Sequence, residues 1–137
     1  MASNRNIKDA DLSVTTTLPA AAANNSSAAI DLGSVTLGAA AESVEYKIDV
    51  PILPALIDDK TVIFTLTDSA TVGGSYVAIS GTGSFTVTGT ETPGTPAALE
   101  FFGKLPVSTR QFIKLKQTVL TGAGVNTGES TDFSIRH

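Results

Sequence analysis

The sequence contains no cysteine, no tryptophan and a single histidine, His137, which is its last residue. Without cysteine the chain can form neither a disulfide bond nor a thiolate metal site, so packing, hydrogen bonds or a partner must hold its fold. One histidine also excludes metal sites built on two of them. Because a chain terminus is usually mobile, His137 is a poor general base, and no Ser–His–Asp triad is expected.

Long apolar runs are missing as well. No segment approaches the roughly 20 apolar residues of a membrane-spanning helix. The opening residues, MASNRNIKDADLSV, lack the apolar stretch that a secretory signal requires. We therefore expect a chain made in the cytoplasm of its host cell, with no membrane partner.

Positive charge is scarce. Charged residues make up 16% of the chain, the net charge is −4 and the isoelectric point is near 4.7. Affinity for nucleic acid comes largely from lysines and arginines that displace counterions from phosphates. An acidic chain of this kind is not expected to bind nucleic acid.

What the chain has in quantity is β-forming residues. It is 137 residues long, 42% hydrophobic, and contains nineteen threonines among many valines and isoleucines. This length suits one domain with its own core, and β-branched residues favour strands while glycines punctuate turns. About eight short strands with no βαβ alternation predict an all-β fold: a sandwich, a barrel or a jelly roll.

Strands are predicted where apolar and polar residues alternate. The segments ESVEYKIDV, TVIFTLTDS and TDFSIRH each place their large apolar side chains on one face. The expected inward residues are Val44, Tyr46, Ile48, Val50, Val62, Phe64, Leu66, Phe133 and Ile135. Between the first two strands, PILPALIDDK is expected to be a packed connection, because its two prolines prevent regular pairing.

The first 27 residues differ from the remainder, since they are polar, rich in alanine and short of large apolar side chains. We expect residues 1–27 to form an N-terminal arm and residues 28–137 to form the β-sandwich domain. The segment LSVTTTL can add as a strand to a neighbouring sheet. The candidate contact residues of this arm are Arg5, Lys8, Leu12, Val14 and Leu18.

The segment LPVSTRQFIKLKQTV, residues 105–119, holds three of the nine lysines and arginines. As a strand it would place Gln111, Ile113, Leu115, Gln117 and Val119 in the core and leave four candidate interface residues facing outward: Arg110, Phe112, Lys114 and Lys116. This outward row is either a solvated face or a contact to an acidic protein surface. An acidic neighbour such as Glu45 or Glu100 would ease the repulsion between the lysines.

No group of residues predicts catalysis or ligand binding. The glycine-rich stretches GTGSF and GAGVNTG do not lead into a helix and lack the lysine of a P-loop, which is typical of hairpin turns. The acidic pair at Asp58 and Asp59 precedes a strand and is expected to be part of a turn. We therefore expect no enzyme activity, no catalytic residue, no cofactor and no metal ligand.

The order of four segments resembles a known family, the capsid cement, or decoration, proteins of tailed bacteriophages. These segments are SSAAIDLGS, YKIDVPIL, VIFTLTDSATVGGSYVAIS and LPVSTRQFIKLKQTV, and they span most of residues 26–136. Each motif alone has low specificity, and the shared order carries the resemblance. The family has no fixed catalytic or ligand motif.

The resemblance implies a jelly-roll-like antiparallel β-sandwich on the outer surface of an icosahedral head. It implies a structural role, in which a symmetric homo-oligomer bridges neighbouring major capsid proteins, and it implies no enzyme activity and no cofactor. We expect a dimer rather than a trimer, and we expect residues 3–18 to become ordered against a capsid subunit or a sister protomer.

Two other functions stay open. A carbohydrate-binding or adhesive β-sandwich module of a phage tail or bacterial surface would have the same fold, but such modules usually present exposed tryptophan or tyrosine. The only tyrosines are Tyr46, expected to face inward, and Tyr76. A small hydrolase would need a convergent catalytic cluster, which the sequence does not indicate.

Overall fold

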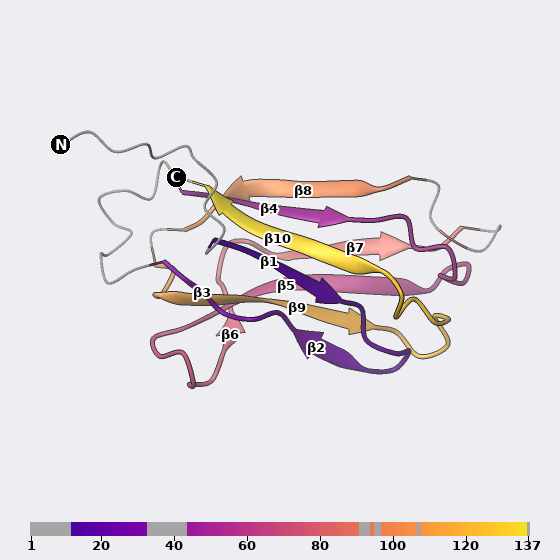
Figure 1. Cartoon of the computed structure of the whole chain (residues 1–137), viewed down its shortest axis with the longest axis horizontal. Helices are drawn as coiled ribbons and strands as arrows, with labels where there is room; N and C mark the ends of the chain where they lie inside the picture. The colour runs from indigo at the N-terminus through magenta and orange to yellow at the C-terminus, as the bar shows by residue number, and fades with distance from the viewer. Residues whose placement is uncertain (1–11, 33–43, 91–93, 95–96, 107, 137) are drawn as a thin grey trace.

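A computed structural model describes residues 12–32, 44–90, 94, 97–106 and 108–136. It shows two antiparallel β-sheets packed face to face (Figure 1). Sheet A contains, in spatial order, β1 (Ser13–Thr17), β10 (Ser130–Arg136), β4 (Glu45–Val50) and β8 (Leu99–Lys104). No helix among the described residues is long and apolar enough to cross a membrane.

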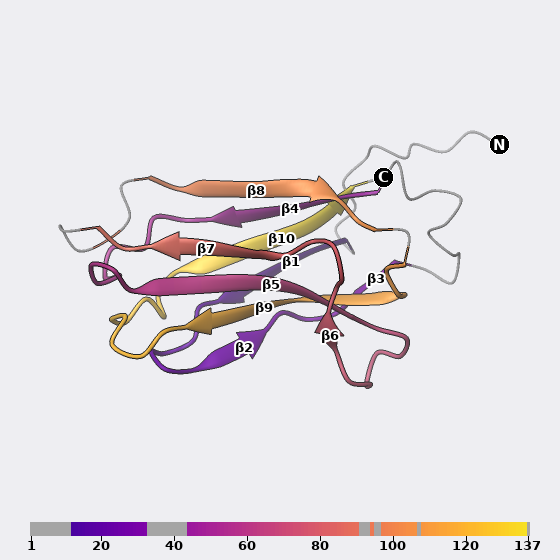
Figure 2. The ribbon, with the colours of Figure 1, turned by 180° about the vertical axis from the view of Figure 1, so that it is seen from behind.

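Sheet B forms the second layer and faces the viewer in Figure 2. Its path runs through β2 (Asn24–Ser26), β9 (Phe112–Val119), β5 (Thr61–Ser69) and β6 (Val77–Ala78). Two further strands lie beside this path: β3 (Ile30–Asp31) pairs with β9, and β7 (Ser84–Thr88) pairs with β5. Sheet B therefore has six strands and sheet A has four.

The strand pairs are nested, as in one long hairpin that has been rolled up. Strand β1 pairs with β10, β2 and β3 pair with β9, β4 pairs with β8, and β5 pairs with β7. When β2 and β3 are counted as one interrupted strand and β6 as an addition, this is the eight-strand pairing of a jelly roll. The expected jelly-roll-like sandwich of about eight strands is confirmed.

The core lies between the two sheets and is built from alternating residues of each strand. The expected inward side chains of β4, β5 and β10 are all buried, which confirms the period of two in those segments. Their solvent-exposed fractions are 6% for Tyr46 and at most 2% for Val44, Ile48, Val50, Val62, Phe64, Leu66, Phe133 and Ile135.

Residues 51–60 and 120–126 meet at one end of the sandwich, where Gly89 and Gly94 donate backbone hydrogen bonds to Lys60 and Leu56 and Ile57 donates one to Ala123. Leu53 and Leu56 are fully buried there, whereas Ile52 and Ile57 are exposed. Two of the four large apolar side chains in the connection PILPALIDDK therefore pack into the core. At Gly124, with φ of +88°, a side chain would collide with the carbonyl oxygen of Ala55. A residue without Cβ lets the two loops approach this closely.

The predicted boundary between an arm and the domain does not hold for residues 12–27. Strand β1 forms an edge of sheet A, and β2 forms an edge of sheet B. Leu18 is 2% exposed, and Leu12 and Val14 pack against the core. These short polar strands are stabilised by long partner strands far along the chain, which local composition does not reveal.

Candidate protein-binding surface

The sandwich presents two broad outer faces of different chemistry. The outward side chains of β5, β7 and β9 form one of them, which we call the lysine face. It consists of Thr61, Ile63, Thr65, Ser84, Thr86, Thr88, Phe112, Lys114, Lys116 and Thr118. Hydroxyl groups and two cations dominate this face, so it suits a partner that is polar and acidic.

Strand β9 positions the two lysines. Ile113, Leu115, Gln117 and Val119 are buried on its inner side, which confirms the expected core row and leaves the alternate residues outside. Gln111, placed by the prediction at the start of that row, lies before the strand, and its side chain donates a hydrogen bond to Asp31 Oδ1 at 2.9 Å. The inner row anchors the strand, and the outer row is free for a second role.

Lys114 is held in place by an aromatic ring. Its Nζ atom lies 4.4 Å from the ring centroid of Tyr76, a distance that allows a cation–π interaction. The Tyr76 hydroxyl donates a hydrogen bond to the carbonyl oxygen of Val72 at 2.9 Å, which fixes the ring. Burial raises the pKa of Tyr76, so this phenol stays protonated at neutral pH.

Lys116 is exposed, and its cross-strand neighbours are Thr65 on β5 and Ser26 on β2. The residue opposite Lys114 on β5 is also a threonine, Thr67. Within the described ranges, the ion pairs are those of Lys47 and Arg110. Neither lysine of the face is therefore neutralised by a carboxylate in this part of the chain.

Neither Glu45 nor Glu100 is an acidic neighbour of the two lysines, because neither lies on a strand that pairs with β9. Strand β9 pairs with β2, β3 and β5, whereas Glu45 and Glu100 belong to sheet A. There Glu45 lies opposite Lys104, and Glu100 lies opposite Asp49. The two carboxylates are separated from the lysines by the thickness of the sandwich.

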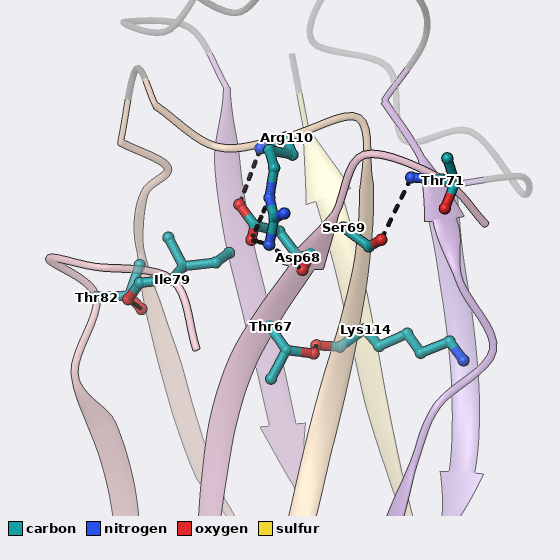
Figure 3. A network of polar contacts seen from close by, with 8 residues as sticks. All are labelled: Thr67, Asp68, Ser69, Thr71, Ile79, Thr82, Arg110 and Lys114. Atoms are coloured by element: carbon teal, nitrogen blue, oxygen red, sulfur yellow. Dashed lines mark hydrogen bonds and ion pairs between the residues drawn. The ribbon is translucent and has the colours of Figure 1, made fainter. Parts of the chain in front are cut away.

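Arg110 does not belong to the outer row of β9, because the strand begins at Phe112; its side chain is 41% exposed and binds Asp68. It lies before β9 and reaches over the end of β5 to the side chain of Asp68 (Figure 3). Its Nε and Nη2 atoms donate to Asp68 Oδ1 at 3.0 and 2.8 Å, and Nη2 also donates to the Asp68 carbonyl oxygen at 2.7 Å. Its backbone N–H donates to Oδ2 at 2.9 Å.

This pair closes one end of the core. The Asp68 side chain is only 8% exposed, so its charge needs the hydrogen bonds that Arg110 supplies. Thr109 precedes it in a tight turn, donating from its backbone N–H and its hydroxyl to the Pro106 carbonyl oxygen. Lys114 extends away from the cluster (Figure 3). The arginine of the basic segment is therefore structural, and its lysines remain available.

The arm residues do not join this surface. Leu12 and Val14 are partly buried against the core and Leu18 is 2% exposed, so these three side chains do not lie on the lysine face. Arg5 and Lys8 lie outside the described residues. Phe112 is half-buried opposite Asp31 and Ser69, so of the nine predicted contact residues the structure leaves Phe112, Lys114 and Lys116 together on one face.

The other outer face belongs to sheet A and carries charges of both signs. We call it the acidic face, and its charged residues are Glu45, Lys47, Asp49, Glu100, Lys104 and Asp132. Lys47 Nζ lies 3.2 Å from Glu100 and 3.5 Å from Asp49. The hydrogen bond to Glu100 and the charge of Asp49 raise the pKa of Lys47. Lys47, Asp49 and Glu100 are thus paired with one another.

Two shallow hollows lie on the acidic face. One, of about 240 Å³, is lined by Glu45, Tyr46, Lys47, Glu100 and Phe102. The other, of about 210 Å³, includes Asp49, Glu100 and Asp132 in its lining. Among the described residues, no group of three or more histidines, cysteines or acidic residues is arranged to hold a metal ion.

One buried polar contact was not anticipated from the sequence. Gln117 is fully buried, and its Nε2 atom donates to the Thr17 carbonyl oxygen at 3.0 Å and to Asn25 Oδ1 at 2.9 Å. Asn25 Nδ2 donates to the same carbonyl at 2.9 Å. The contact ties β9 to the connection between β1 and β2, so it links the N-terminal strands to the centre of sheet B.

No protein-family model matches the chain, and no curated protein matches it. Among solved structures, the chain is similar to one described as "Family 16 Carbohydrate Binding Module-2". The two share 10% sequence identity with a TM-score of 0.31, and the match covers 86% of this chain and 70% of the other.

Proposed function

We propose that the protein is a capsid cement, or decoration, protein of a tailed bacteriophage. In this role it binds the outer surface of an icosahedral head as a homo-oligomer, preferably a dimer, and stabilises the head by bridging neighbouring major capsid proteins. It is made in the host cytoplasm and resides on the outside of the virion. The proposal assigns it no enzyme activity, no cofactor and no nucleic-acid partner.

The observation that carries the proposal is the lysine face. It is a broad sheet surface on which Lys114 and Lys116 have threonines and a serine, rather than carboxylates, as cross-strand neighbours. Positive charge next to hydroxyl donors complements an acidic protein surface and guides its association. The nested strand pairing supports the proposal further, since a jelly roll is what the family resemblance implies.

The head would supply many equivalent sites. A partner that binds only the folded protein stabilises it against unfolding by mass action. The stabilisation is larger when several linked sites are bound at once. A protomer that contacts two capsid subunits would stabilise both against separation. Arg5 and Lys8 remain candidate contacts in this proposal, together with the lysine face.

The test is binding to purified heads that lack the protein. Addition of the full chain should give a copy number approaching that of the shell protein and should raise the temperature at which heads release DNA. The double variant Lys114→Glu/Lys116→Glu should bind at least about tenfold more weakly, since like charges across an interface cost several kcal/mol.

A matched control separates this effect from net charge. Lys116→Glu and Lys60→Glu change the charge equally, but Lys60 lies before β5, near Gly122, at the end of the sandwich where residues 51–60 and 120–126 meet. Only Lys116→Glu should weaken binding to heads. Equal binding by wild type and by the double variant would contradict the role of the lysine face, and absence of the wild-type chain from purified heads would contradict the proposed function itself.

A carbohydrate-binding or adhesive module is the second candidate, and one observation favours it. Phe102 is 73% exposed and borders the hollow lined by Glu45, Lys47 and Glu100, so a sugar ring could stack on it between polar groups. Calorimetric titration with oligosaccharides tests this candidate, and the Phe102→Ala variant should abolish any heat of binding. Binding of sugar by the isolated chain would favour this candidate over the first.

A further inference from the structure

Strand β8 forms one edge of sheet A. It pairs with β4 on one side, and it runs along the rim of the molecule in both views (Figure 1 and Figure 2). An edge strand presents backbone N–H and C=O groups that have no neighbouring strand, and these groups can pair with another chain. The edge of β8 is six residues long, from Leu99 to Lys104.

The side chains of β8 differ from those of β7 and β1. The outward residues of β7 are Ser84, Thr86 and Thr88, and those of β1 are Ser13, Thr15 and Thr17. Strand β8 instead places Phe102, 73% exposed, between Glu100 and Lys104 on the acidic face. A highly exposed aromatic residue between two charges of opposite sign is a feature that can favour association of an edge strand with a complementary strand.

We infer that β8 pairs with the β8 strand of a second copy, antiparallel and about a two-fold axis at Phe102, so that the two A sheets form one continuous sheet. In this register Phe102 lies opposite Phe102 of the second copy. Glu100 lies opposite Lys104 of that copy, and Lys104 lies opposite its Glu100. The edge is thus complementary to itself, as a two-fold interface must be.

Neighbouring registers lack this match. Opposite residues in a sheet must face the same side, so a symmetric antiparallel pair must be centred on a residue. Centring on Phe101 would place Glu100 opposite Phe102, and centring on Gly103 would place Phe102 opposite Lys104. Only the register centred on Phe102 forms two ion pairs and one aromatic pair on the outer face.

The inner face of the strand fits the same register. Phe101 stacks on Phe85 with ring centroids 5.0 Å apart, and Gly103 faces Tyr46, whose hydroxyl oxygen would lie 2.7 Å from a Cβ atom at position 103. In the dimer Phe101 lies opposite Gly103 of the second copy, so a large side chain meets a residue without one. Glu100 is held by Lys47 but its side chain is still 55% exposed, which leaves it open to a second cation.

The inference rests on the homo-oligomer of the proposed function and identifies the surface through which that oligomer forms. It is nevertheless tested on the free protein, so failure of head binding and failure of the dimer are separate results. A six-residue strand pair buries less area than a standard stable interface, so a dissociation constant on the order of 10 µM is expected. Sedimentation velocity over a concentration series should show the monomer converting to a dimer in that range.

A charge-exchange experiment tests the register. Glu100→Lys and Lys104→Glu should each prevent dimerisation, because each creates two like-charge pairs. An equimolar mixture of the two variants should form a heterodimer about tenfold tighter than either homodimer, because every pair is then of opposite sign. The double variant should also dimerise, although it leaves both introduced charges beside like charges on β4. Lys116→Glu, which changes net charge as Lys104→Glu does, should leave dimerisation unchanged.

A cross-linking experiment tests the axis without depending on charge. The chain has no cysteine, so Phe102→Cys introduces a single thiol, and residues opposite each other across strands have Cα atoms at disulfide distance. Under mild oxidation this variant should form a covalent dimer at least about tenfold faster than the edge control Thr86→Cys. Equal rates for the two variants, a wild-type chain that stays monomeric, or a dimer insensitive to Lys104→Glu would each overturn the inference.

Discussion

The two outer faces of the sandwich use charge in opposite ways. On the acidic face, Lys47 lies between Asp49 and Glu100 and neutralises charge within one chain. On the lysine face, Lys114 and Lys116 lie among hydroxyl groups. Charges that are paired within the molecule contribute to the fold, whereas unpaired charges of one sign are available to a partner. We therefore expect loss of Lys47 to affect stability, and loss of Lys114 or Lys116 to affect the proposed binding to heads.

Arg110 and Lys116 give the strongest test of this difference, because both belong to the basic segment but only Arg110 has a buried partner. Replacement of Arg110 by alanine should lower the free energy of unfolding by about 3 kcal/mol, since it leaves the Asp68 carboxylate without its cation. Lys116→Ala should change it by less than about 0.5 kcal/mol. Urea denaturation followed by circular dichroism measures both, and equal losses would contradict the assignment.

Lys47 tests the acidic face. Lys47→Met should lower the urea midpoint, because Asp132, Asp49 and Glu100 then form a cross-strand row without the lysine between them. The loss should shrink as salt is raised from about 0.01 to 1 M, since exposed charges are screened. Lys114→Met on the other face should show no such salt dependence, and a salt-independent loss for Lys47→Met would mean that its alkyl chain, not its charge, contributes.

Alkaline pH should weaken the fold through groups on both faces and in the core. Burial raises the pKa of Tyr46 and of Tyr76, and the contacts with Glu100 and Asp49 raise that of Lys47. Each group binds its proton more tightly when folded, so its contribution is fully present below the unfolded values of 10.0 for tyrosine and 10.5 for lysine. It is lost as the pH rises through the folded values.

The measurement is the urea midpoint between pH 8 and pH 12. Tyr46→Phe should lose less stability over this interval than wild type, because it removes the buried phenol that must otherwise stay protonated. Tyr76→Phe should show a smaller change, since Tyr76 is only half-buried. An unchanged pH profile for Tyr46→Phe would contradict the assignment of the core phenol.

Much of the fold followed from local patterns. The alternation of apolar and polar residues predicted that Tyr46, Phe64 and Phe133 face the core, and they do. A strand with one buried face carries an apolar side chain at every second residue. Strands β1 and β2 were taken for part of an arm because they are short and polar, and their partners β10 and β9 lie about a hundred residues away. The pairing of distant segments depends on the topology of the whole fold, so the residues of a single strand do not reveal it.

The surface was harder to predict than the core. The outward position of Lys114 and Lys116 was a consequence of alternation, and it is confirmed. The contact of Arg110 with Asp68 depends on a residue 42 positions away and on a turn at Thr109, so no local pattern indicates it. The exposure of Phe102 depends on β8 lying at an edge of sheet A, which only the order of strands determines.

The nested pairing also sets the order in which the protein can be assembled during its synthesis. Strand β1 is synthesised before the other strands, yet it joins sheet A only through β10, which is synthesised after them. Until residues 130–136 emerge, sheet A consists of the β4–β8 pair, and Leu18 lacks its hydrogen bond to Glu129. Nascent chains should therefore stay incompletely folded until β10 has emerged, and a stop codon before β10 should give an insoluble product rather than a smaller domain.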